Sequence, residues 1–363
     1  MTQKCVALLG RRDEPTDALG EYCKYLGEAL ASHGFAMQIV RVPWNEAGWP
    51  QAIGDLKHAA HDWRGSWVLL QYTALSWSEH GFPSRFLRII KILQHNGARV
   101  AVVYHDVEPF SGRRMVDRLR RRSQLRVMRA AQRRSLAIFT VPTGVISWRP
   151  NHKHRHAFIP VGANFPEPVM ASEQARASSD EKLTIAVFGV TGGASGQSEI
   201  RDIAQAVRIA AQEAGSLRLV VLGRNSEAAE KDLREALPGV PVELRVLGVL
   251  ASEDVAKTLL QADVLLFVRG EISTRRGSAI AGIACGLPVV AFAGVETAPP
   301  ITAAGLALYS PKIPGDLSRV LVKVLNDSEY RTSLAARSRA AQREYFSWSA
   351  IAASYAELLN ERS

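Results

Sequence analysis

Two consecutive stretches, VELRVLGVLASEDVAKTLLQADVLLFV (242–268) and RGEISTRRGSAIAGIACGLPVVAF (269–292), carry the pattern that decides the fold. Apolar runs typical of buried strands occupy residues 242–248, 264–268 and 287–294, and amphipathic helical patterns occupy residues 252–263 and 277–286. Ser252 stands where a helix N-cap is expected. Continuous apolar strands that alternate with helices predict a parallel α/β sheet covered on both faces.

The same alternation extends toward both ends of the chain. In the second half, strand patterns occupy 183–190 and 217–223, and helical patterns 200–215, 227–237 and about 314 to the end. In the first half, strand patterns occupy 4–10, 36–42, 66–72, 99–107, 135–143 and 157–162, and helical patterns 18–35 and 83–98. Between the two halves, residues 166–182 are rich in Pro, Ser, Ala and charged residues and interrupt the alternation of strands and helices. We therefore expect domains at 1–165 and 183–340, a linker at 166–182 and a closing helix at 341–363.

Composition restricts the protein class. The chain has 363 residues, of which 47% are apolar and 22% charged, as in ordinary globular proteins. It has no run of 18 apolar residues, and the run from Val6 to Gly10 is too short for a signal peptide. The three cysteines, an odd number without CxxC spacing, argue against a disulfide framework or zinc site and are most simply buried apolar residues. We therefore expect a cytoplasmic location.

The net charge of +10 has mainly one source. Residues 113–134 hold ten arginines and one acid, Asp117, so this segment alone carries +9. Its apolar residues partly line one helical face, and a basic amphipathic helix is typical of a peripheral protein on an anionic membrane. A solvated basic face is the alternative, followed by nucleic acid or an acidic partner. The segment has no aromatic residue for base stacking, so nucleic acid is not expected.

The two opening stretches resemble the donor-binding half of glycosyltransferase family 4, which shows "ADV-x-L" and a helix ending in "ACG-x-PVVA". Weaker similarities are HGFAMQIV (33–40), VAVVYHD (100–106), FIPVGANF (158–165) and YFSWSAIAASYAELL (345–359). The resemblance implies a GT-B fold, with two Rossmann-like domains facing a cleft and a C-terminal helix that crosses back to the first. It also implies retaining sugar transfer from a UDP- or GDP-linked donor to a glycan or lipid-linked acceptor in polysaccharide biosynthesis, with no metal and no further cofactor.

The loop 271–278 should carry the donor site. It leads from a strand into a helix, whose N-terminal N–H groups suit a diphosphate, and arginine binds phosphate oxygens bidentately. A solvated turn with a helix cap is the alternative. The residues expected to bind the donor are Gly189, Thr191, Arg224, Ser273, Thr274, Arg275, Arg276, Gly277 and Ser278.

This chain departs from the family pattern at the donor site. The family has two glutamates eight positions apart, and Ser273 and Ala281 stand in their places. Glu271, two residues before the first, is the candidate substitute. Val190 stands where the family often has an arginine for the diphosphate. Arg275 and Arg276 are candidates for the missing charge, and loss of donor binding is the alternative.

The reacting end is expected to involve His105, Asp106 and Glu271 as catalytic residues, with Gly20 on the acceptor side. His105 and Asp106 follow a buried strand, and Gly20 lies where the family has a glycine-rich turn before its first helix. Each has a structural alternative: a histidine that caps the sheet and a glycine that marks a helix start.

The glycine-rich stretch VTGGASGQSE (190–199) also resembles the cofactor loop of short-chain dehydrogenases. That family requires a glycine where Ser198 stands, an acid after the next strand, which here ends in Gly223-Arg224, and a Tyr-x-x-x-Lys pair that the sequence lacks. We therefore interpret this stretch as a loop facing the donor diphosphate.

Two functions follow. The first is a glycosyltransferase, and the alternative is an inactive binding or scaffold protein that kept the fold and lost the paired glutamates. Convergence of Glu271 with Arg275 and Arg276 on one pocket would favour the enzyme.

Overall fold

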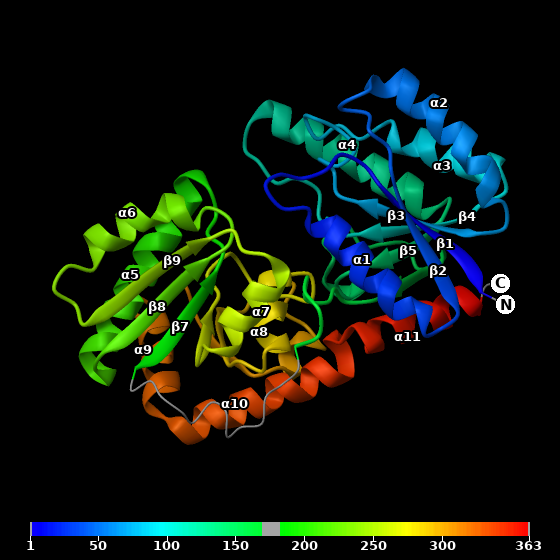
Figure 1. Cartoon of the computed structure of the whole chain (residues 1–363). Helices are drawn as coiled ribbons and strands as arrows, with labels where there is room; N and C mark the ends of the chain where they lie inside the picture. Colours follow the sequence, from blue (N-terminus) through cyan, green and yellow to red (C-terminus); the bar gives the residue numbers. More distant parts are fainter. Residues whose placement is uncertain (1, 169–181, 362–363) are drawn as a thin grey trace. The chain divides into compact units, whose positions relative to one another are not determined.

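The computed structural model describes residues 2–168 and 182–361. The chain forms two compact units, residues 1–160 together with 348–363, and residues 161–347 (Figure 1). The expected linker, 166–182, falls largely on residues 169–181, which lie outside the described residues. The domain boundaries expected from the sequence therefore stay predictions.

The first unit is built on a six-stranded parallel sheet with the order β2-β1-β3-β4-β5-β6. Its strands are β1 (Gln3–Leu9), β2 (Phe35–Arg41), β3 (Trp67–Tyr72), β4 (Arg99–Tyr104), β5 (Leu136–Phe139) and β6 (His156–Phe158). Along β1, Val6 and Leu8 pack into one apolar cluster, while Cys5 and Ala7 on the opposite face are equally buried. Burial on both faces explains why these strands read as continuous apolar runs.

Helices cover both faces of this sheet. They are α1 (Ala18–Ala31), α2 (Gly48–Ala60), α3 (Phe86–His95), α4 (Met115–Gln132) and α11 (Trp348–Asn360). Ile53 of α2, Ile89 of α3 and Val127 of α4 share one cluster on one face. On the other, α11 lies beside α1, as Figure 1 shows. The Tyr22 and Tyr355 hydroxyls are 3.0 Å apart. The predicted return of the C-terminal helix to the first unit is confirmed.

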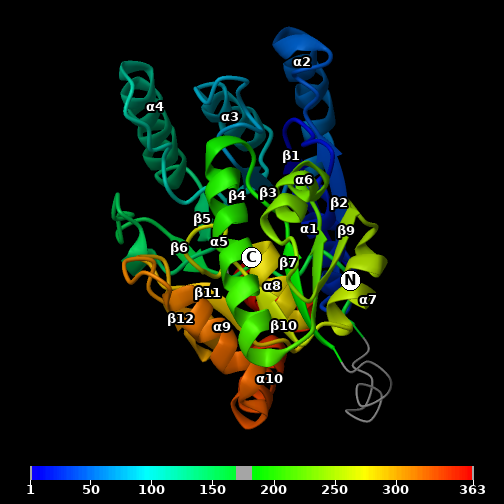
Figure 2. The same cartoon turned by 90° about the vertical axis from the view of Figure 1, so that its left-hand side faces the viewer.

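The second unit repeats the design with the strand order β12-β11-β10-β7-β8-β9, all parallel. Its strands are β7 (Leu183–Phe188), β8 (Leu217–Leu222), β9 (Val242–Gly248), β10 (Val264–Leu266), β11 (Val289–Phe292) and β12 (Leu306–Tyr309). Its helices are α5 (Gly193–Ala214), α6 (Ser226–Ala236), α7 (Ser252–Leu260), α8 (Gly277–Ala284), α9 (Asp316–Asn326) and α10 (Ser328–Ala341). Figure 2 shows α5 beside α9, and their buried residues share a core with α6.

Two local expectations were wrong. The stretch 190–199 is not all loop, because α5 already begins at Gly193. A Cβ atom at Gly196 would lie 1.8 Å from the Thr191 carbonyl oxygen, so this helical glycine allows a close backbone approach. Ser252 is the first residue of α7 and not its N-cap, because the extended backbone conformation ends at Ala251.

The order of the strands places a topological switch point in each sheet. β1 lies between β2 and β3, and β7 lies between β8 and β10. In open α/β sheets, ligands bind beyond the carboxyl ends of the strands at such points. The described helices include none that is long and apolar enough to cross a membrane. Cys5, Cys23 and Cys285 are buried free thiols, as predicted.

Candidate functional site

The switch point of the second sheet brings together Gly189, which follows β7, and Arg269, which follows β10. Gly189 has a φ of +79°. A Cβ atom at this position would stand 2.7 Å from Nη1 of Arg269. Only a glycine both adopts this backbone conformation and leaves room for the guanidinium. The glycine turn therefore places a cation at the carboxyl edge of the sheet.

Arg269 carries a charge that the nearby carboxylate of Glu199 influences without forming an ion pair with it. Burial lowers the pKa of its guanidinium, the charge of Glu199 opposes this shift, and the smaller effect of Arg224 adds to it. Among the described residues, the Arg269 guanidinium has no hydrogen bond or ion pair. Glu199 itself accepts a hydrogen bond of 2.8 Å from the backbone N–H of Thr191. A half-buried guanidinium without a partner is a ready site for an anion.

Arg276 lies at the start of α8 and adds to this charge. Burial lowers the pKa of Arg276, and the nearby charges of Arg275 and Arg269 lower it further, while carboxylates oppose the shift. Its Nε donates to the carbonyl oxygen of Glu271 at 3.3 Å. The charges of Arg276 and Arg269 therefore repel one another, and a bound anion would offset that repulsion.

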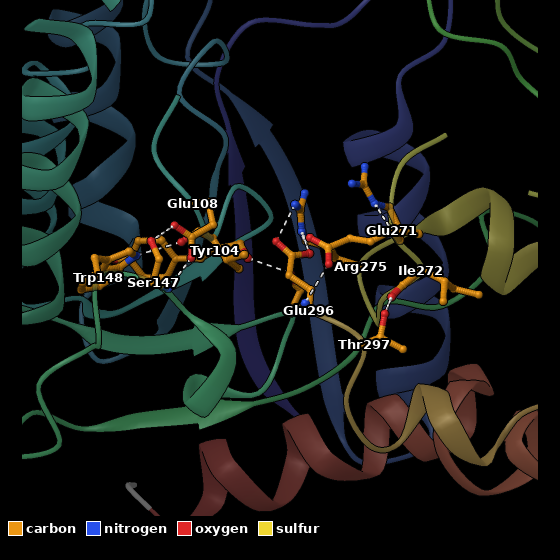
Figure 3. A network of polar contacts seen from close by, with 12 residues as sticks. Tyr104, Glu108, Ser147, Trp148, Glu271, Ile272, Arg275, Glu296 and Thr297 are labelled. Carbon is orange, nitrogen blue, oxygen red and sulfur yellow. Dashed lines mark hydrogen bonds and ion pairs between the residues drawn. The ribbon is translucent and has the colours of Figure 1, made fainter. Parts of the chain in front are cut away.

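Arg275 is paired within the protein (Figure 3). Its Nε and Nη2 donate to the two carboxylate oxygens of Glu296 at 2.7 and 2.8 Å. Glu296 is 4% exposed. Burial alone would raise the pKa of Glu296, but the hydrogen bonds and charge of Arg275 outweigh burial and hold that pKa below its ordinary value. The charge of Arg275 is thus compensated before any ligand arrives.

Glu271 joins the same network. Its Oε2 accepts a hydrogen bond of 3.0 Å from the backbone N–H of Glu296, and a Cβ atom at Gly294 would lie 1.7 Å from that oxygen. Thr297 Oγ1 donates to the carbonyl oxygen of Ile272 at 2.6 Å (Figure 3). These hydrogen bonds therefore join the loop after β10 to the loop after β11, and Glu271 accepts one of them.

The remaining expected donor residues divide into two groups. Ser273 and Thr274 are completely buried, and the backbone carbonyl of Thr274 accepts a hydrogen bond of 3.1 Å from Val161 N–H. Gly277 and Ser278 are half-buried at the first turn of α8, and the space around Gly277 is open. Their positions favour Gly277 and Ser278 for contact with a ligand, and Ser273 and Thr274 for support of the loop.

In the first unit, His105 directly follows β4 and is half-buried. Its Nε2 lies 2.8 Å from Gln71 Oε1, while Gln71 Nε2 donates to the Leu69 carbonyl oxygen at 3.3 Å. That second bond orients the amide, so His105 carries its proton on Nε2 and leaves Nδ1 as an acceptor. The edge of Tyr22 contacts the same ring. Burial lowers the pKa of His105 to about 4, so the imidazole is neutral at physiological pH.

Asp106 and Gly20 both have local structural partners. Asp106 Oδ2 accepts a hydrogen bond of 2.8 Å from the backbone N–H of Ala74. Gly20 N–H donates to the N-cap Asp17 at 3.2 Å, and a Cβ atom here would meet both that carboxylate and the Arg41 guanidinium paired with it. The contacts of Gly20 match the structural alternative considered for it, a glycine at a helix start, and the roles of both residues in the reaction stay predictions.

The carboxyl edge of the first sheet also carries a cavity of about 610 Å³. Its lining comes from the segments that follow β1, β2 and β3, including the start of α2, and contains Arg11, Trp44, Trp49 and Arg85. The two indoles stack with centroids 5.1 Å apart, and the Arg85 guanidinium lies over Trp49. Aromatic walls with a few convergent polar groups are typical of small-molecule sites.

Sequence reasoning missed Arg269, Glu199 and Glu296. Arg269 had a usable signal, because it directly follows a buried strand that ends at the ligand-binding edge. Glu296 had none, because only folding brings it to Arg275. Within the residues that the structure describes, no group of three His, Cys, Asp or Glu side chains is placed to hold a metal ion.

Residues 186–327 match the family described as Glycosyl transferases group 1. No curated protein sequence is significantly similar to this chain. Among solved structures, HepE from Anabaena, in complex with UDP and glucose, is 16% identical with a TM-score of 0.67, and the match covers 99% of this chain and 100% of that one.

Sucrose-phosphate synthase from Thermosynechococcus elongatus is 20% identical with a TM-score of 0.69, over 99% of this chain and 98% of that one. WaaG, a glycosyltransferase involved in lipopolysaccharide biosynthesis, is 16% identical with a TM-score of 0.63, over 98% of this chain and 99% of that one. These structural matches give the whole chain the expected GT-B fold.

Proposed function

We propose that this chain, a glycosyltransferase of the GT-B fold with a group 1 domain at residues 186–327, transfers a sugar from a nucleoside diphosphate sugar held by its second unit to a glycan or lipid-linked acceptor. The observation that carries the proposal is the arginine pair, Arg269 and Arg276, at the switch point of the second sheet, because neither guanidinium forms an ion pair among the described residues. Two clustered guanidinium groups suit the two phosphates of such a donor.

The chemistry follows from the charge of these groups. Departure of a nucleoside diphosphate builds negative charge on its phosphate oxygens, and fixed guanidinium groups in a half-buried site stabilise that charge. We propose that these residues, with the N-terminus of α8, do this work without a metal, and that the transfer proceeds with retention. Arg275, Glu271 and Glu296 hold the loop in place, so their role is to position Arg276.

On the acceptor side, the proposal uses the first unit. His105 is neutral and offers Nδ1 as an acceptor, and the aromatic cavity next to the switch point of that sheet fits a saccharide. HepE was solved with UDP and glucose, and WaaG is involved in lipopolysaccharide biosynthesis. By analogy, we propose UDP as the carrier and a cell-surface polysaccharide precursor as the acceptor.

We also propose that α4 holds the enzyme on an anionic membrane. Near its N-terminus, large apolar side chains are exposed beside arginines, and Met115 is 78% exposed and Leu119 56%. Arg118, Arg121 and Arg122 are exposed on the same helix. Exposed apolar residues framed by cations are typical of helices that lie in the membrane interface.

Calorimetric titration of the full chain with UDP, GDP, ADP and uridine tests the donor site. We expect one nucleoside diphosphate to bind, and Arg269→Ala to weaken it 10- to 100-fold without changing uridine affinity, because uridine lacks phosphates. Arg234→Ala, on the exposed face of α6, is the matched control and should bind as the wild type does. Absence of nucleotide binding in the wild type, or unchanged affinity in Arg269→Ala, would contradict the proposal.

A further inference from the structure

A second basic site lies at the opposite, amino-terminal edge of the first sheet. It is a cavity of about 470 Å³ whose lining includes residues that precede β4, β5 and β6. Its cationic residues are Arg99, Arg133, Arg134, Lys153 and Arg155, joined by His154. No carboxylate lines the cavity. This edge is separate from the carboxyl edge, where the expected reacting residues of the first unit lie.

Most of these charges are uncompensated. Arg134 uses Nη1 to donate to the Ala130 carbonyl oxygen at 3.0 Å, at the end of α4. The Arg99 guanidinium lies over the ring of Trp67, which also lines the cavity. Within the described part of the chain, Arg133 and Arg155 have no carboxylate partner. Like charges gathered around one cavity repel, and a multivalent anion would relieve that repulsion.

We propose that this cavity binds a phosphate-bearing anion, with Arg133 and Arg155 as its main ligands. Guanidinium groups match phosphate oxygens in geometry and charge, and several cations around one concave site raise the local concentration of anions. A cavity of about 470 Å³ has room for a phosphate or diphosphate group. The site is independent of the donor site, because it lies in the other unit and shares no residue with it.

Sodium pyrophosphate is the probe, and tryptophan fluorescence is the readout, because Trp67 lines the cavity. We expect a saturable change in fluorescence that is lost in Trp67→Phe. The double variant Arg133→Gln/Arg155→Gln should bind pyrophosphate at least tenfold more weakly, without a lower melting temperature, since the substitutions remove repulsion. Arg88→Gln/Lys91→Gln, on the exposed face of α3, is the control.

Arg269→Ala separates this site from the donor site and should leave the Trp67 signal unchanged. Co-sedimentation with phosphatidylcholine vesicles, with and without phosphatidic acid, identifies the source of the phosphate. If the double variant loses binding to the anionic vesicles, the ligand is a lipid headgroup. If it loses only pyrophosphate, the ligand is soluble. Wild-type pyrophosphate affinity in the double variant, or absence of a Trp67-dependent signal, would overturn the proposal.

Discussion

Arg269 lies directly against Gly189, with Nη1 only 2.7 Å from the place where a Cβ atom would stand. The two residues follow β10 and β7, the neighbouring strands at the switch point of the second sheet. Val190, the next residue, stands where the resembling family often has its arginine. Arg269 thus brings a guanidinium to the same turn from a different strand.

Gly189→Ala should therefore both strain the backbone and displace Arg269. The positive φ predicts a loss of about 1–2 kcal/mol in the free energy of unfolding, and displacement of the guanidinium predicts weaker UDP binding. Gly239→Ala is a matched control, because its φ is +70° and its surroundings are open. Urea unfolding and calorimetry should show similar destabilisation in both variants but lower UDP affinity only in Gly189→Ala. Equal UDP affinity would contradict the role of this contact.

The Arg275–Glu296 pair predicts a double-mutant cycle with strong coupling. Glu296→Gln should destabilise the second unit by about 2–4 kcal/mol, because it removes the carboxylate charge that compensates a half-buried guanidinium. Arg275→Gln/Glu296→Gln should cost less than the sum of the single variants. Additive losses, measured by urea unfolding at pH 7, would show that the pair is not coupled.

The same pair predicts a pH dependence. The pKa of Glu296 lies below its ordinary value in the folded chain, so its stabilising contribution is present above the unfolded pKa of about 4.3. That contribution is lost as the pH falls through the lowered folded pKa. Unfolding free energies measured from pH 6 down to pH 3 should fall more steeply in the wild type than in the double variant.

His105 predicts a separate titration between pH 6.5 and 4. Its folded pKa, about 4, lies below the unfolded value, so the unfolded state binds more protons in this window and stability rises with pH. The contribution is at most roughly 3 kcal/mol. NMR titration should show the His105 ring neutral at pH 5.5, and His105→Gln should flatten the stability curve, unlike the exposed His95→Gln. A His105 pKa near 6.5 would contradict this environment.

The surface of α4 predicts binding to anionic vesicles. Arg118→Gln/Arg121→Gln/Arg122→Gln should weaken binding by about two orders of magnitude, from roughly 1 kcal/mol for each charge. Met115→Ser/Leu119→Ser should weaken binding even at high salt, because it removes apolar area rather than charge. Lys57→Gln/Arg88→Gln/Lys91→Gln is the charge-matched control on α2 and α3. Vesicle co-sedimentation with and without phosphatidylglycerol measures the effect, and equal loss in the control would reject α4 as the contact surface.

The sequence predicted most elements of both sheets because their signals are local. Strands buried on both faces read as continuous apolar runs, and each predicted strand begins within two residues of the observed start, although the predictions for β4, β5 and β6 run three or four residues too far. The sequence analysis did not assign α2 or β12. β12 is only Leu306–Tyr309, and Leu308 is 43% exposed, so it lacks the long apolar run of a central strand.

The candidate site was harder to predict for a physical reason. The sequence analysis selected the loop 271–278, with Arg276, and Gly189 as parts of the donor site, and their roles stay predictions. The sequence analysis treated the charge of Arg275 as available to the donor, but in the fold Arg275 forms an ion pair with Glu296. It expected the hydroxyls of Ser273 and Thr274 to face the donor, but both residues are completely buried. The spacing of apolar residues along the chain does not show which loops lie next to each other in the fold. It therefore cannot assign hydrogen-bond or ion-pair partners to polar side chains.

By itself, the sequence therefore determined two parallel α/β sheets, the basic character of residues 113–134 and the strand ends at which ligands should bind. Those features depend on hydrophobic burial and charge along short segments of the chain. The tertiary structure alone decided which arginine charges are paired with a carboxylate. It paired Arg275 with Glu296 and left Arg269 beside Gly189, because both outcomes depend on contacts between loops that follow different strands.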